Sequence, residues 1–198
     1  MCVFCAGINK LAVITKNKKD IMIKEFKEWV STNLDSQKGK TAIVTGANSG
    51  IGFYTALGLA KLGATVIVAG RNKERIEEAI QAIEKETITG NVFAGIIDLA
   101  SLNSVRAFAN EFNNNHTQLD LLINNAGVMM PPESKTEEGF ELQFGVNFLG
   151  HFLLTDLLYR KLVSTQNSRV VTLSSIAHRG SSIDFENLRV EKPYDTKR

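Results

Sequence analysis

Hydrophobic and polar positions alternate along most of this chain in a repeating order. From residue 40 onward, short apolar runs are followed by longer segments in which apolar residues recur every three or four positions. The runs predict buried strands and the periodic segments predict amphipathic helices. We expect strands at 42–44, 65–69, 91–97, 119–123 and 169–173, and helices at 51–62, 73–87, 101–113 and 136–164. This alternation is typical of an α/β fold with helices on both faces of a parallel sheet.

The residues that end the predicted strands are small, polar or charged. They are Thr45-Gly46, Arg71, Asp98, Asn124-Asn125 and Ser174-Ser175. In doubly wound parallel sheets, ligands bind at the carboxyl ends of the strands, where the strand order reverses. These strand ends therefore indicate a ligand site at one edge of the sheet.

The first of these strand ends opens a glycine-rich stretch, 40–52, which reads KTAIVTGANSGIG. A strand, a turn and a helix follow one another there, so backbone N–H groups and a helix N-terminus would face an anion such as a pyrophosphate. Gly46 permits a tight exit from the strand, Gly50 lets the backbone approach the phosphates, and Gly52 lets the first helical turn pack on the sheet. The spacing is G-x-x-x-G-x-G, and this motif alone leaves open three glycines in an ordinary turn. With right-handed crossovers, we predict a Rossmann-type doubly wound sheet of strand order 3-2-1-4-5.

The region before the first predicted strand is expected to form two segments outside the α/β domain. Residues 1–20 are expected to be a disordered extension that ends in a charged linker, and 21–39 to be a short amphipathic helix and a polar turn. The helix would pack on the domain, which we favour, or lie weakly on a membrane surface. The remainder, 40–198, is predicted to be a single NAD(P)-binding domain.

Composition and charge exclude several classes of protein. The chain has 198 residues, 43% hydrophobic and 22% charged, with a net charge of +2. That balance does not favour a nucleic-acid partner. Cys2 and Cys5 form an isolated C-x-x-C, and neither they nor His116 and His178 have the neighbours that a metal site needs. We expect no metal and a cytoplasmic location, with membrane association as the alternative.

Five ordered motifs resemble the short-chain dehydrogenase/reductase family, and most of all its retinol-dehydrogenase-like branch. The motifs are TGANSGIG at 45–52, DLAS at 98–101, NNAG at 124–127, VNFLGHFLLT at 146–155 and VVTLSS at 170–175. The resemblance implies an oxidoreductase that transfers a hydride between a nicotinamide cofactor and an alcohol or carbonyl compound. A retinoid or other lipid-like substrate is the suggestion of the branch alone.

The resemblance also implies roles for individual residues. It implies cofactor contacts from Gly46, Asn48, Ser49, Gly50, Ile51, Gly52, Asp98, Leu99, Asn125, Ala126 and Gly127. Asp98 and Leu99 would border the adenine. Asn147 would hold a water molecule in a proton relay, and Ser175 would polarise the substrate oxygen.

Arg71 bears on the choice of cofactor. An acidic residue after the second strand would bind the ribose 2′-hydroxyl of NAD and repel a 2′-phosphate, but this chain has Gly70 and Arg71 there. An arginine suits a phosphate. We therefore predict NADP(H) over NAD(H), with an exposed arginine of no function as the alternative.

The Y-x-x-x-K pair that supplies the proton in this family is not in the sequence. Tyr54, Tyr159 and Tyr194 are followed at i+4 by Gly58, Val163 and Arg198. Reduction of a carbonyl needs a proton donor, so we expect the chain to stop before its catalytic helix, to lack the C-terminal strands of the family fold and to show little turnover. The alternative function is a non-catalytic NADP(H)-binding module.

The long predicted helix 136–164 carries two further features. His151 lies four residues after Asn147, on the same face, and we interpret it as a packing residue. Phenylalanines recur every fourth position at 140, 144, 148 and 152. They indicate either core packing or a subunit interface, so a homo-oligomer through this helix stays open.

Overall fold

A computed structural model describes residues 16–87, 91–180 and 182–192. The chain divides into two compact units, one ending at Asp35 and one beginning at Ser36. The predicted extension and the Cys2–Cys5 pair lie outside the described residues, except for 16–20. Of the described residues, no helix is both long and apolar enough to cross a membrane.

The first unit contains one helix, α1 (Lys16–Asn33). It starts earlier than the predicted helix, and residues 16–20, which we expected to be a linker, form its first turns. Lysine is a good helix former, so the charged cluster is compatible with helix. Lys24 and Glu28 form an exposed i,i+4 ion pair, with 3.8 Å between Nζ and Oε1.

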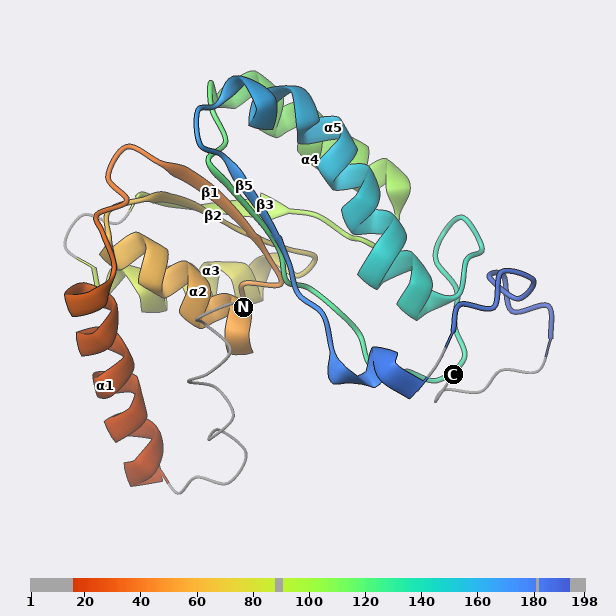
Figure 1. Cartoon of the computed structure of the whole chain (residues 1–198), viewed down its shortest axis with the longest axis horizontal. Helices are drawn as coiled ribbons and strands as arrows, with labels where there is room; N and C mark the ends of the chain where they lie inside the picture. Colours follow the sequence, from red (N-terminus) through yellow and green to blue (C-terminus); the bar gives the residue numbers. More distant parts are fainter. Residues whose placement is uncertain (1–15, 88–90, 181, 193–198) are drawn as a thin grey trace. The chain divides into compact units, whose positions relative to one another are not determined.

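The second unit is built on a five-stranded parallel sheet whose order, β3-β2-β1-β4-β5, confirms the predicted 3-2-1-4-5. The strands are β1 (Thr41–Thr45), β2 (Thr65–Gly70), β3 (Asn91–Ile96), β4 (Leu121–Asn124) and β5 (Arg169–Thr172). The helices α2 (Gly50–Lys61) and α3 (Lys73–Glu84) cover one face of the sheet. The other face carries α4 (Leu102–Asn115) and α5 (His151–Ser164) (Figure 1).

Each face of the sheet has its own apolar core. Ile43 and Leu122 point into the core under α4 and α5, whereas Val44 and Ile123 point into the core under α2 and α3. Successive residues of a strand face opposite sides, so a strand buried on both faces must be apolar throughout. This is why β1 and β4 read as unbroken apolar runs.

Two helices begin at the caps that their sequences provide. Ser101 Oγ accepts a hydrogen bond from the Ser104 N–H at 3.3 Å and caps α4. Asn72 Oδ1 accepts from the Arg75 N–H at 2.8 Å and starts α3.

The predicted helix 136–164 is wrong at its start. Residues 136–141 form a loop. An isolated bridge between Lys135 and Glu141 closes it, and Gly139 within it has a φ of 80°. A left-handed residue interrupts a helix. The helix then enters a π-helical segment, η3 (Phe144–Gly150), and continues as α5. Gly145 allows this arrangement, because a Cβ there would overlap the Thr136 side chain of the loop.

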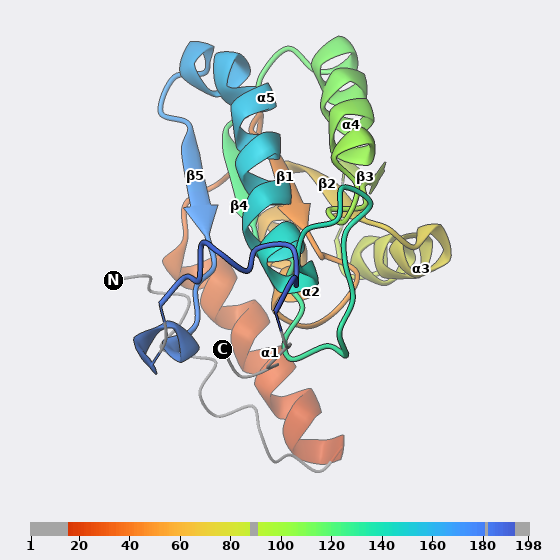
Figure 2. The ribbon, with the colours of Figure 1, turned by 90° about the vertical axis from the view of Figure 1, so that its right-hand side faces the viewer.

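The sheet ends at β5, whose side chains are mostly exposed, Val170 by 44%. Figure 2 shows β5 at one edge of the sheet, opposite β3. After β5 the chain forms a short 3-10 helix, η4 (Ile176–Gly180). An exposed apolar strand edge is prone to pair with other chains.

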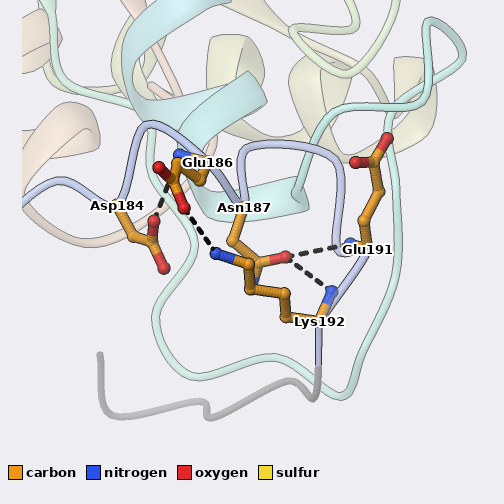
Figure 3. Close-up of polar contacts among 5 residues, drawn as sticks. All are labelled: Asp184, Glu186, Asn187, Glu191 and Lys192. Atoms are coloured by element: carbon orange, nitrogen blue, oxygen red, sulfur yellow. Dashed lines mark hydrogen bonds and ion pairs between the residues drawn. The ribbon is translucent and has the colours of Figure 1, made fainter.

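The segment 182–192 contains no helix or strand, but polar contacts fold it into a compact turn (Figure 3). Asn187 Oδ1 accepts from the N–H groups of Glu191 and Lys192, both at 2.9 Å, and Lys192 Nζ pairs with Glu186 Oε2 at 2.9 Å. The turn is held on the loop 135–141. There Leu188 O accepts from the Glu141 N–H at 2.8 Å and the Arg189 guanidinium lies 4.1 Å from the Phe140 ring centroid.

Candidate functional site

The carboxyl ends of β2, β1 and β4 lie side by side, which brings their terminal residues together. Thr45 pairs with Ala69 of β2, and Val44 pairs with Ile123 of β4. The chain order reverses at β1, because β2 lies on one side of it and β4 on the other. A crevice at such a switch point is the general ligand position of doubly wound sheets.

The glycine turn leaves β1 in a backbone conformation that glycine favours. Gly46 and Gly50 have φ values of 64° and 56°, in the left-handed region. A Cβ on Gly46 would lie 2.9 Å from Ala126 Cα, and one on Gly52 would lie 2.4 Å from Asn125 Nδ2. A Cβ on Gly50 would meet no described atom within 4 Å. Gly46 and Gly52 thus allow two chain segments to touch, while Gly50 leaves room above the turn.

Asn125 and Thr45 lock the glycine turn to the segment that follows β4. Asn125 Nδ2 donates to Thr45 O at 2.7 Å. Thr45 Oγ1 accepts from the backbone N–H groups of Asn125 at 2.9 Å and Ala126 at 3.0 Å. The two segments that the sequence assigned to the cofactor are therefore one hydrogen-bonded unit.

His151 is buried, with 4% of its surface exposed, and contacts Thr45 from the helix side. Its Nε2 lies 2.9 Å from Thr45 Oγ1, and its Nδ1 lies 3.1 Å from Asn147 O. The Thr45 hydroxyl already accepts twice, so it must donate its own proton. Its two acceptor contacts are Ile123 O at 3.3 Å and His151 Nε2 at 2.9 Å, and the shorter one is to Nε2. The network thus assigns the neutral tautomer with the proton on Nδ1, which donates to Asn147 O. Burial lowers the pKa of His151 below its ordinary value and so favours the neutral ring, whereas the hydrogen bond to Asn147 O raises the pKa and offsets only part of that shift.

Asn147 lies in the π-helical segment η3, with its side chain turned to the strand end of β4. Its Oδ1 accepts from the Val128 N–H at 2.8 Å, and its Nδ2 donates to Val128 O at 2.9 Å. One N–H and one lone pair of the Asn147 amide are therefore engaged with the backbone of Val128. π-Helical turns occur frequently at functional sites.

Asp98 and Leu99 follow β3. Asp98 Oδ1 accepts from the Ala100 N–H at 2.9 Å, and Ser104 Oγ accepts from the Asp98 N–H at 2.9 Å, so the carboxylate is held at the strand end. Leu99 differs, because its side chain is buried in the core with Val146 and Leu154. A ligand beside Leu99 would meet its backbone.

Arg71 is exposed just after β2, and a pocket of about 380 Å³ lies beside the glycine turn. Asn48 and Ser49 line this pocket from the turn, and Arg75 and Glu78 line it from α3. The Asn48 side chain also reaches Gly70 at the end of β2, 3.5 Å from where a Cβ would lie. One arginine and one carboxylate thus line the pocket from α3, and Arg71 lies outside this lining.

Ser175 lies after β5 on an exposed stretch. Its Oγ accepts from the Ala177 N–H at 3.2 Å, and its carbonyl accepts from the His178 N–H at 3.2 Å. It is thus held by its own turn, in contrast to the residues of β1, β4 and η3, which bond to one another.

Sequence reasoning missed two polar residues of this network. Thr45 was noted only as a strand end, and His151 was interpreted as a packing residue. A threonine immediately before the first glycine, and a histidine one helical turn after Asn147, were the signals available. His151 is indeed buried, but both of its ring nitrogens have polar partners.

The sequence of this chain matches the model of a known protein family. The model for the short chain dehydrogenases matches residues 40–186. The chain therefore belongs to the short-chain dehydrogenase family, a family of oxidoreductases.

Retinol dehydrogenases are among its relatives in sequence. The chain is 54% identical to retinol dehydrogenase 13 of Mus musculus over 160 residues, which cover 80% of this chain and 48% of that protein. It is 48% identical to retinol dehydrogenase 11 of Homo sapiens over 174 residues, or 87% of this chain and 54% of that protein. The chain thus spans about half the length of these relatives.

Solved structures share the fold as well. An uncharacterised protein from Mycobacterium Paratuberculosis superposes with a TM-score of 0.73 at 42% identity, covering 85% of this chain and 58% of that one. The RhlG/NADP active-site complex of Pseudomonas aeruginosa gives a TM-score of 0.62 at 29% identity, covering 72% and 57%.

Proposed function

We propose that this chain binds NADP(H) at the carboxyl ends of β1, β2 and β4, as part of an oxidoreductase acting on an alcohol or carbonyl compound. The observation that carries the proposal is the bonded unit of the glycine turn and Asn125. It places Gly50, with a φ of 56° and open space above it, at the N-terminus of α2 and at the switch point of the sheet. Backbone N–H groups of a helix N-terminus suit a pyrophosphate.

The residues at the other strand ends fit the remaining parts of a dinucleotide. Asp98, held by Ala100, would accept from the adenine amino group, and Gly127 would lie along the cofactor beside Asn147. When bound, the nicotinamide supplies or accepts the hydride. Ser175 would hold the substrate oxygen, as the family resemblance implies.

The proposed preference for NADP(H) rests on the charges around the pocket beside the turn. Arg71 and Arg75 are both exposed on this side, and Asn48 and Ser49 add polar groups. A planar guanidinium suits a phosphate, and Glu78 would oppose it. Arg75 and Glu78 cancel in formal charge within the pocket lining, so the proposed preference depends on Arg71 at the end of β2.

The experiment is a calorimetric titration of the chain with NADPH and with NADH. We expect tighter binding of NADPH, and a loss of about 10- to 100-fold in that affinity in Arg71→Asp, because one charge-assisted hydrogen bond contributes about 1.5–3 kcal/mol. NADH binding should change little. Arg169→Asp is the matched control, since Arg169 begins β5 at the opposite end of the strands. Equal affinity for both cofactors, or an unchanged preference in Arg71→Asp, would refute the preference.

The substrate class is proposed from the relatives, which bear the name retinol dehydrogenase. We expect a retinoid or similar lipid-like carbonyl compound for the whole protein, and little turnover from the 198 residues themselves. The measurement is NADPH oxidation with retinal as substrate. Turnover by this chain would show that another group supplies the proton. NADPH binding without turnover is the expected result for this chain.

Self-association is proposed through the outer face of the long helix. Phe148, Phe152, Tyr159 and Val163 are each at least half exposed and lie along one side of η3 and α5. Light scattering should show that Phe152→Lys shifts a dimer to monomer, whereas Phe93→Lys on the exposed edge strand β3 does not.

We expect the protein to be located in the cytoplasm. Weak membrane association through the region before residue 30 is the alternative.

A further inference from the structure

The segment 125–128, between β4 and the following loop, is held at both of its ends. At its start, the N–H groups of Asn125 and Ala126 donate to Thr45 Oγ1. At its end, Val128 exchanges two hydrogen bonds with the Asn147 side chain. Gly127 lies between the two anchors, and a Cβ there would lie 3.3 Å from Asn147 Oδ1.

His151 is the residue that joins these two anchors. Its Nε2 contacts Thr45 Oγ1 at 2.9 Å, and its Nδ1 contacts Asn147 O at 3.1 Å. The imidazole therefore bridges the end of β1 and the π-helical segment η3 across the buried side of the segment. Both ring nitrogens thus have polar partners, and these partners belong to the two elements that hold the ends of the segment.

We infer that His151 is a positioning residue, whose neutral ring with the proton on Nδ1 fixes the shape of the segment 125–128. Thr45 and Asn147 each hold one end of that segment, and His151 sets the distance between them. The inference rests on the proposed function only where it concerns cofactor affinity, because the segment lines the proposed site. The tautomer and the local structure can be tested without a cofactor.

The first test is ¹⁵N-edited NMR of the imidazole nitrogens in the labelled chain. The sequence has only three histidines, so His151→Phe assigns the His151 signal. We expect a ring with the proton on Nδ1 that stays neutral below the ordinary histidine pKa of about 6.5. The hydrogen-bond partners that face the ring are uncharged, Thr45 from β1 and Asn147 from η3, and no charged group contributes to its pKa shift. A proton on Nε2, or a protonation midpoint near 6.5, would overturn the inference.

The second test separates the two contacts. In His151→Asn, the amide nitrogen takes the position of Nδ1, so this variant keeps the Asn147 contact. In His151→Gln, the longer side chain reaches toward the position of Nε2, so this variant keeps the Thr45 contact. We expect His151→Phe to weaken NADPH binding about three- to ten-fold, which corresponds to one net hydrogen bond, and the two amides to fall between it and wild type. Amide resonances of Ala126 should move most in His151→Asn, and those of Val128 most in His151→Gln.

The outcomes distinguish this inference from the proposed function. His116→Phe is the control, since His116 ends α4 and stacks on Phe112 away from the segment; it should leave NADPH affinity unchanged. If the folded His151→Phe binds NADPH as wild type does, the positioning role is refuted. If wild type binds no nicotinamide cofactor, the proposed function fails, and the tautomer and the amide shifts decide the inference. If His151→Phe does not fold, the amide variants supply the affinity test.

Discussion

Gly52→Ala tests whether the contact between the glycine turn and Asn125 holds the site together. A methyl group at position 52 would lie 2.4 Å from Asn125 Nδ2 and 2.5 Å from Gly46 O. Both distances are far below van der Waals contact, so the Asn125 side chain must move and its hydrogen bonds to Thr45 O and Gly46 O must weaken.

The magnitude follows from three terms. Forced overpacking costs about 1–3 kcal/mol, and a lost hydrogen bond costs about 0.5–1.5 kcal/mol. Replacing glycine by alanine inside a helix stabilises the helix by about 1 kcal/mol, which offsets part of these costs. We therefore expect Gly52→Ala to lower the free energy of unfolding by about 1–3 kcal/mol, which corresponds to about 2–10 °C in melting temperature for a domain of this size.

The assay is urea unfolding followed by circular dichroism, with two matched glycine variants. Gly180→Ala places its methyl group in open space at an ordinary φ and should leave the stability within about 0.5 kcal/mol of wild type. Gly50→Ala also meets no described atom, but its φ of 56° should cost about 1–2 kcal/mol in strain. Asn125→Ala should rescue Gly52→Ala only in part, because Gly46 O is backbone and remains. If Gly52→Ala were as stable as Gly180→Ala, the close approach of the two segments would be refuted.

Three other predictions concern the same network. Thr45→Val should destabilise the fold by about 2–3 kcal/mol in urea unfolding, because two backbone N–H groups lose their acceptor, whereas Thr45→Ser should cost only its methyl group, about 1 kcal/mol. Asn147→Ala should cost about 1 kcal/mol and raise the amide hydrogen exchange of Val128 above that of wild type; unchanged exchange there would contradict the contact. Because burial lowers the pKa of His151, the unfolded state binds the proton first, so stability should be complete above about pH 6.5 and fall below it by up to about 1.4 kcal/mol per pH unit, until the folded protein is protonated too. His151→Phe should flatten that pH dependence, and an equally steep profile in this variant would assign it to another group.

The central strands followed from the sequence because a strand buried on both faces must be apolar throughout, and the strand order followed from right-handed crossovers. The positions of the glycine turn and of Asp98 after their strands were also predictable, since they depend on strand ends and on local backbone geometry. The loop 136–141 was not, because it depends on Gly139 and on the Thr136 side chain packing at Gly145, a contact between separate segments. The His151 bridge was hidden for the same reason. Helical spacing placed it near Asn147, but only the fold brings Thr45 to its other nitrogen.

Ile43 and Val44 of β1 are adjacent in sequence but belong to different cores. Ile43 shares its core with Leu158 of α5, which is more than 100 positions away. Energetic coupling follows contact and not sequence distance. Truncations at 43 and 44 should therefore add nearly independently in a double-mutant cycle, whereas truncations in one core should not. The sheet thus separates the two cores energetically, so that the residues of either core can be redesigned while those of the other are left unchanged.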